Sequence, residues 1–162
     1  MKVLTVWQPW ASAIAIGAKL VENRTWKPTP GLLKVGDYVG IHAAVRKWSQ
    51  EDAVDVADRI FRGRNGAPAP APFGDVVTYQ LWFEHLEANA GKLVAIARVA
   101  AFVEQREDIA ETQQKWWVGP IGWLLDDVQR LPQAISIKGA QGLWNLPNEV
   151  LDAARAQLRK AA

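Results

Sequence analysis

The chain contains no cysteine, so it can form neither a disulfide nor a thiolate-ligated zinc site. It has only two histidines among 162 residues, which argues against a metal centre built from imidazoles. We therefore expect no metal and no cofactor. Hydrophobic residues never run for the roughly 20 positions that a membrane-spanning helix needs. The opening stretch MKVLTVWQPW contains Pro9 and has no long apolar run, so we expect a cytoplasmic protein without a signal peptide or membrane contact.

Several signatures of catalysis are missing as well. The segment GRNGAPAPAPFG at residues 63–74 is rich in glycine, but it lacks the Lys-Ser/Thr ending of a phosphate-binding loop. No nucleophile elbow and no helical pair of metal-binding histidines is present. These absences exclude the common nucleotide hydrolases, serine hydrolases and zinc proteases.

Tryptophan is abundant, with nine residues, and positive charge is concentrated in one part of the chain. Residues 1–74 contain ten Lys or Arg against six Asp or Glu, whereas residues 75–162 contain nine against eleven. The first part is therefore the better candidate to face an anionic partner, although the same numbers fit an ordinary scatter of surface charge. Hydrophobic residues make up 49% of the sequence, which is enough for the core of one domain covering residues 1–162.

The hydrophobic periodicity predicts several short strands with a few helices between them. The predicted strands cover residues 2–7, 20–26, 37–44, 92–104, 122–131 and 134–146, and the predicted helices cover 10–16, 50–61, 77–88 and 148–160. This order is typical of the α+β class, with a small mixed β-barrel surrounded by helices. The Pro/Ala/Gly-rich segment 63–74 is predicted to be a flexible loop.

The stretch VWQPWASAIAIGAKLVENRTW at residues 6–26 places polar groups among large rings. Lys19 follows the predicted end of the first helix. Alternation along the next strand puts Glu22, Arg24 and Trp26 on one face. A guanidinium and a carboxylate can bind the edges of a nucleobase, and tryptophan can stack on its ring. The alternative is a structural salt bridge beside a core tryptophan.

Three further segments carry candidate residues, each with two interpretations. WWVGPIGW at 116–123 places Trp123 where it either lines a pocket or plugs the barrel. In IKGAQGLWNLP at 137–147, the glycines beside Lys138 either admit a ligand close to the backbone or form a bulge. In HAAVRKW at 42–48, His42, Arg46 and Lys47 suit phosphate contacts, but a lone strand histidine also fits a structural role.

Together these segments resemble the ASCH domain, a member of the PUA-like superfamily. The resemblance comprises the opening Gln-Pro-Trp-Ala-Ser, Gly-x-Lys and Glu-Asn-Arg-x-Trp blocks, followed by HAA, GPIGWLL and KGAQGLWNLP in the same order. It covers nearly the whole chain. It implies a small PUA-like β-barrel with surrounding helices and a cleft between them, in a family associated with RNA binding or RNA chemistry.

Some short ASCH proteins are amidohydrolases that remove the acyl group from N4-acetylcytidine. In those proteins a lysine after the first helix and a threonine three residues later carry the reaction, with a glutamate further on. The lysine corresponds to Lys19, but Glu22 stands where the threonine is expected, and Thr25 faces the other side of the predicted strand. This chain thus departs from the amidohydrolase pattern at the nucleophile.

Three hypotheses follow. The first is a binder of RNA or of a nucleoside within it, and the second is a small hydrolase of a modified nucleoside or RNA in which Lys19 and Glu22 act on the substrate. The third is a protein-interaction module that uses exposed tryptophans as anchors; the sequence leaves the protein partner open. The candidate catalytic residues are Lys19 and Glu22, and the candidate ligand-binding residues are Gln8, Trp10, Ser12, Arg24, Trp26, His42, Arg46, Lys47, Trp123 and Lys138.

Overall fold

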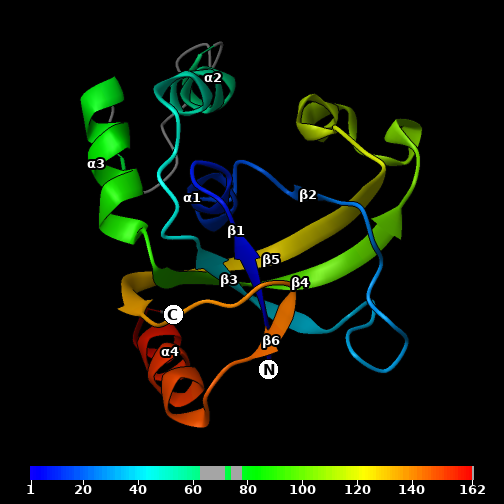
Figure 1. Ribbon diagram of the computed structural model, residues 1–162, viewed down its shortest axis with the longest axis vertical. Coiled ribbons are helices and arrows are strands. Elements are labelled where there is room, and N and C mark those ends of the chain that lie inside the picture. The colour runs from blue at the N-terminus through cyan, green and yellow to red at the C-terminus, as the bar shows by residue number, and fades with distance from the viewer. Residues whose placement is uncertain (63–71, 74–77, 162) are drawn as a thin grey trace.

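The computed structural model describes residues 1–62, 72–73 and 78–161. In this part of the chain a curled β-sheet is surrounded by helices (Figure 1). The strands are β1 (Lys2–Val6), β2 (Val21–Arg24), β3 (Tyr38–Ala43), β4 (Lys92–Val103), β5 (Ile121–Ser136) and β6 (Leu143–Asn145). The helices are α1 (Trp10–Ala15), α2 (Gln50–Phe61), α3 (Tyr79–Asn89) and α4 (Asn148–Ala161), with two 3-10 turns, η1 (Arg106–Asp108) and η2 (Glu111–Trp116).

The six strands form one mixed sheet in the order β2-β5-β4-β3-β1-β6. β1 and β3 are parallel, and the other neighbouring strands are antiparallel. β4 and β5 are long and shift register at several points, and such irregularities increase the bend and twist of a sheet. The sheet curls into a partly open barrel in which β2 and β6 are the two edge strands (Figure 1).

Helix α1 lies on the inner side of the curled sheet and separates two parts of the core. On one side Ile14 packs with sheet residues such as Leu4 and Ile41. On the other side Ala13 packs with residues of α2 and α3. Because α1 has neighbours on both sides, all of residues 11–15 are buried. The loops at its ends, which carry Gln8 and Lys19, are fixed by the same packing.

Helices α2 and α3 pack against each other beyond α1 (Figure 1). Ser49 and Thr78 cap their amino termini by accepting hydrogen bonds from the amides of Asp52 and Leu81. Trp82 is fully buried between the two helices, and its indole Nε1 donates to the Ala53 carbonyl at 2.9 Å. Helix α4 covers the opposite face of the sheet, where Leu151 and Ala154 are buried in a third cluster.

The α+β class, the mixed sheet and the helices around it were predicted correctly. The prediction of two strands at 122–131 and 134–146 was wrong. β5 runs without interruption through Pro132 to Ser136, and only Leu143–Asn145 forms β6. β5 pairs with β2 only through residues 121–124, so its later part has β4 alone as a partner. Pro132, which has no N–H to donate, is tolerated there because one side of the strand is unpaired.

The predicted strand at 20–26 is shorter in the structure, since β2 ends at Arg24 and Trp26 lies beyond it. The predicted flexible loop at 63–74 lies outside the described residues, apart from Pro72 and Phe73. The ring of Phe73 contacts those of Phe61, Trp82 and His85. Among the described helices, none combines the length and the apolar character that crossing a membrane requires.

His85 on α3 is packed among aromatic rings. Its imidazole stacks on Trp82 with ring centroids 5.8 Å apart, and the Asn89 amide donates to its Nε2 at 3.0 Å. Burial lowers the pKa of His85 from 6.5 to about 4, and the positive charge of Arg130 contributes in the same direction. The folded protein therefore keeps His85 neutral at a pH where the unfolded chain would protonate it.

We expect His85 to make the protein less stable in acid. Between about pH 6.5 and about pH 4 the unfolded state binds more protons at this residue than the folded state, so the free energy of unfolding falls as the pH falls. Because the ring is partly exposed, we expect a contribution of about 2 kcal/mol. Urea unfolding at pH 7 and pH 5 checks this. His85→Gln should show a smaller drop than the wild type, and equal drops would contradict the assignment.

Candidate functional site

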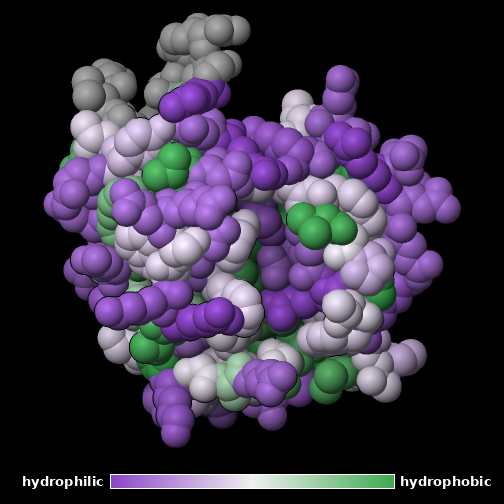
Figure 2. Space-filling view, turned by 45° about the horizontal axis from the view of Figure 1, so that its top comes forward, coloured by the Kyte–Doolittle hydropathy of each residue, from purple (hydrophilic) through white to green (hydrophobic). Residues whose placement is uncertain are grey.

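A pocket of about 530 Å³ opens where β1, β2 and β3 end, beside the segment that leads into β6. The face drawn in Figure 2 is hollowed near its middle, with hydrophilic side chains in the walls of the hollow. The pocket is lined by Thr5, Trp7, Arg24, His42, Ala44, Val45, Lys138, Gly139, Ala140, Gln141 and Gly142. Three of the predicted ligand-binding residues, Arg24, His42 and Lys138, thus come together. Among the described residues that line the pocket there is no aspartate or glutamate.

Arg24, the last residue of β2, lines the pocket, and its guanidinium is held by two contacts. Its Nη2 donates to the Thr5 carbonyl at 2.8 Å and pairs with Glu22 Oε1 at 3.0 Å. Its Nε is buried and makes no hydrogen bond with any described residue. The guanidinium is therefore held through Nη2, and Nε is a donor that no described residue uses.

Glu22 and Lys19 lie behind Arg24, away from solvent. The Lys19 side chain is only 2% exposed, and its ammonium donates to the Val21 carbonyl and to Glu22 Oε2, the latter at 2.8 Å. Both oxygens of the Glu22 carboxylate are thus bound by cations. The strand alternation correctly placed Glu22 and Arg24 on one face. Pairing of a buried charge offsets much of its desolvation cost, so the three groups form one unit with a net positive charge.

His42 occupies the floor of the pocket on β3 and is 1% exposed. Its Nε2 donates to the Ile137 carbonyl at 3.0 Å, while Nδ1 makes no hydrogen bond with a described residue. Burial lowers the pKa of His42, and nearby backbone carbonyls, those of Ile137 and Gly91, oppose this shift. The imidazole is therefore neutral near pH 7.

The segment 137–142 lies across His42 at very short range. A Cβ at Gly139 would come within 2.6 Å of His42 Nδ1, so only glycine fits there without moving the ring. The Ala140 carbonyl accepts from Thr5 Oγ1 at 2.8 Å, and Thr5 Oγ1 accepts in turn from Trp144 Nε1 at 3.1 Å. The segment predicted to be strand at this point is instead a loop that forms one wall of the pocket.

Trp7 was missed by the sequence reasoning, although it lines the pocket. Its side chain is 53% exposed, and the Arg46 guanidinium lies 4.1 Å from the ring centroid. The available signal was its position, because Trp7 directly follows the last core residue of a strand. Lys47, a candidate phosphate contact, is exposed next to Arg46, but neither is among the described residues that line the pocket.

Gln8 and Ser12 lie away from the pocket, inside the protein. The Gln8 side chain donates to Ser12 Oγ at 2.8 Å and to the Leu86 carbonyl at 3.2 Å. Its Oε1 accepts from the Ser12 amide at 3.1 Å. These bonds tie α1 to α3, so the two polar groups stabilise the fold where they lie.

The three predicted stacking tryptophans, Trp10, Trp26 and Trp123, are not among the described residues that line the pocket. Trp123 is fully buried, with ring edges against Trp26 and Phe102, and its Nε1 donates to the Trp26 carbonyl at 3.2 Å. No ring face of Trp123 is open to a base. Trp10 and Trp26 are partly buried against the core clusters. Of the two interpretations, Trp123 fits the plug of the barrel.

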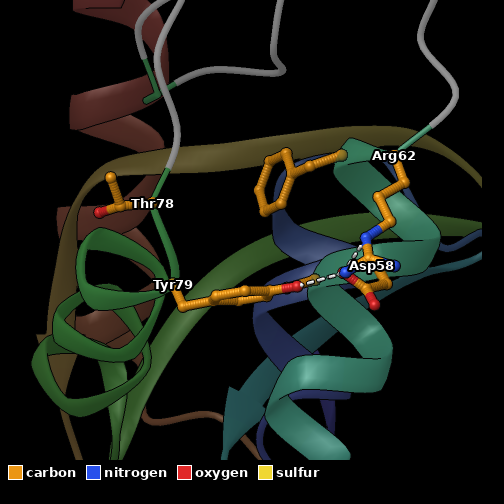
Figure 3. Close-up of a pocket in the computed structure, with 6 residues that line it drawn as sticks. Asp58, Arg62, Thr78 and Tyr79 are labelled. Atoms are coloured by element: carbon orange, nitrogen blue, oxygen red, sulfur yellow. Dashed lines mark hydrogen bonds and ion pairs between the residues drawn. The ribbon is translucent and has the colours of Figure 1, made fainter.

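A second pocket lies between α2 and α3, with a volume of about 450 Å³ (Figure 3). Asp58, Arg62 and Tyr79 point toward one another there. Tyr79 donates to Asp58 Oδ1 at 2.6 Å, Arg62 Nε pairs with the same oxygen at 2.8 Å, and Arg62 Nη2 donates to the tyrosine oxygen at 3.0 Å. Because these groups satisfy one another, this pocket offers a weaker site than the one around Arg24.

A bound metal ion needs several ligand side chains close together. Within residues 1–62, 72–73 and 78–161, no three histidine, aspartate or glutamate side chains gather closely enough to hold a metal ion. The described residues that line the pocket offer hydrogen-bonding groups, positive charge and an aromatic ring.

Comparisons with known proteins give a match at the level of structure. ASCH from Zymomonas mobilis is 16% identical, with a TM-score of 0.49 over 96% of this chain and 93% of that one. A tyrosine-to-phenylalanine variant of that protein gives 16% identity and a TM-score of 0.50 over 96% of both chains. A serine-to-alanine variant gives 17% and 0.47 over 96% and 94%. No family model and no curated protein sequence matches the chain. The chain has the fold of an ASCH domain, as the sequence resemblance predicted.

Glu22→Gln tests the buried charge network. The substitution leaves Lys19 and Arg24 as neighbouring cations without a carboxylate between them, and breaking a buried pair in this way typically costs 3–5 kcal/mol. We expect a loss of about that size in the free energy of unfolding, measured by urea titration. Glu104→Gln is the matched control, because its ion pair with Lys27 is exposed and should contribute little. Similar, small losses in both variants would contradict the structural role of Glu22.

Proposed function

We propose that this protein binds single-stranded RNA, or a nucleoside unit of it, in the pocket around Arg24, His42 and Lys138. The observation that carries the proposal is the composition of the pocket wall. It joins two cationic side chains and a neutral imidazole, and none of the described residues that line it is acidic. Such a wall suits a ligand that combines negative charge with a flat polar ring, as a nucleotide does.

Each part of the wall has a task in this proposal. Lys138 is exposed and serves as a mobile positive charge for a phosphate. Within the described part of the chain, Arg24 Nε and His42 Nδ1 have no hydrogen-bond partner. Both atoms are covered in the free protein, and the glycines of segment 139–142 would let the backbone shift as a base enters. The edge of the base would then form hydrogen bonds with Arg24 Nε and His42 Nδ1.

Two further facts support the proposal. The sequence blocks that resemble the ASCH family, which is associated with RNA, contribute Arg24, His42 and Lys138 to the same pocket. Part of the excess positive charge of residues 1–74 lies at the pocket, because Arg24 lines it and Arg46 contacts the lining residue Trp7.

Lys138→Ala tests this proposal. We expect the wild type to bind short single-stranded RNA at low salt, with an affinity that falls as salt rises. The variant should bind severalfold more weakly, and the slope of log affinity against log salt should decrease by about 0.7, which corresponds to one lost phosphate contact. Fluorescence anisotropy with labelled oligonucleotides at several salt concentrations measures both quantities.

Lys34→Ala is the matched control for that titration. Lys34 is also exposed, but it precedes the first residue of β3, whereas the pocket lies beyond the other end of that strand. Its removal should leave both the affinity and the salt slope unchanged. Absence of wild-type binding at low salt, or equal effects of the two substitutions, would count against the pocket as an RNA site.

A second candidate function is hydrolysis of an N-acylated nucleoside, and the contact between Lys19 and Glu22 favours it. In this reaction Glu22 takes a proton from water as the water oxygen attacks the acyl carbon. Lys19 then gives a proton to the departing amine nitrogen, which leaves a free acid and the nucleoside. Both oxygens of Glu22 are bound in the free protein, so the substrate would have to displace Arg24 from Oε1.

Incubation with N4-acetylcytidine tests this second function. The wild type should release cytidine and acetate, detected by chromatography. Lys19→Met should reduce turnover at least about 100-fold, because it removes the proton donor while Arg24 still neutralises Glu22. A circular dichroism melt establishes that the variant is folded. Wild-type turnover no faster than the buffer blank would exclude this activity for N4-acetylcytidine.

A further inference from the structure

Trp7 and Arg46 form an exposed pair at the rim of the pocket, and neither residue is buried in the core. Trp7 is 53% exposed, and Val45 beside it is 74% exposed. The Arg46 guanidinium lies over the Trp7 ring at 4.1 Å from its centroid. Among the described residues, Arg46 makes no ion pair, so its charge is available to a partner.

We propose that Trp7 and Arg46 form a second nucleotide subsite, which makes the ligand an RNA strand of at least two nucleotides instead of a free nucleoside. This inference rests on the proposed function, since it assumes that one nucleotide occupies the pocket around Arg24 and Lys138. The neighbouring nucleotide then stacks its base on Trp7, and its phosphate lies beside Arg46.

The position of the pair supports a shared ligand. Trp7 and Val45 are themselves part of the pocket wall, so the exposed apolar surface is continuous with the proposed first subsite. Trp7 follows the end of β1, and Val45 and Arg46 follow the end of β3. Because β1 and β3 are parallel neighbours, both segments leave the sheet at the same end.

The chemistry of the pair favours a nucleotide over an acidic peptide. An indole ring offers a stacking surface to any base, and an arginine beside it can contact both the ring and a phosphate. Lys47, exposed next to Arg46, adds a second positive charge for the phosphates of the RNA. A peptide would satisfy the charges, but it would leave the half-exposed ring with a poorer partner.

Calorimetric titration measures how the wild type and Trp7→Ala each bind nucleotide ligands of different length. The probes are the mononucleotides UMP and AMP and the pentanucleotides U5 and A5. We expect the wild type to bind the pentanucleotides more tightly. Trp7→Ala should weaken pentanucleotide binding by about fivefold or more, the effect of one lost base stack, and should leave mononucleotide affinity within about twofold. Trp7→Phe, which retains a ring, should recover most of the lost affinity.

Two more variants sharpen the result. Arg46→Gln should weaken pentanucleotide binding and lower its salt slope by about 0.7. Tyr38→Ala, an exposed aromatic residue at the other end of β3, should change neither. Thermal melts of all variants establish that they are folded.

The possible failures are distinguishable. If the wild type binds neither mononucleotides nor pentanucleotides, the proposed function fails and this inference fails with it. If binding occurs but Trp7→Ala leaves pentanucleotide affinity unchanged, only the second subsite is overturned, and the exposed ring then fits an anchor for a protein. Equal losses for both probe lengths would also overturn the inference, because Trp7 would then belong to the first nucleotide.

Discussion

The Glu22 carboxylate is the point on which the site depends. It binds Lys19 with one oxygen and Arg24 with the other, and through Arg24 it reaches the Thr5 carbonyl. β2 is one edge of the sheet, and Thr5 lies on β1 just past the residues that pair with the other edge strand, β6. The guanidinium therefore connects two sides of the sheet that share no strand pairing. The same contact that closes the partly open barrel also orients the arginine that forms the pocket wall.

The nine tryptophans divide between packing and surface, and this division explains why composition alone was ambiguous. Trp82, Trp116 and Trp123 are almost completely buried, and their indole N–H groups donate to backbone carbonyls. Such bonds satisfy the one polar atom of the ring, so the residues add apolar area to the core at little polar cost. Trp7 differs because its ring is left half in solvent beside a cationic pocket.

Hydrophobic periodicity predicted much of the fold, but it predicted only part of the candidate site. The bounds of α2 were predicted as observed, and alternation brought Glu22 and Arg24 to one face. The role of Trp123 could not be settled this way, because burial of a ring depends on which distant segments cover it. The continuation of β5 through Pro132 depends on an unpaired neighbouring position, which is again a tertiary property. Local patterns thus located the charged residues and left the choice of exposed ring undecided.

The assembly of the pocket depends on topology more than on any single segment. Parallel pairing of β1 with β3 brings Trp7 and His42 to the same end of the sheet. Antiparallel pairing of β6 with β1 makes residues 138–142 arrive at that end as well, since they precede β6. Lys138, from the acidic part of the sequence, thereby joins the cationic residues of the amino-terminal part. A net charge of only +2 conceals this, because the positive side chains gather where β1, β2 and β3 end and β6 begins.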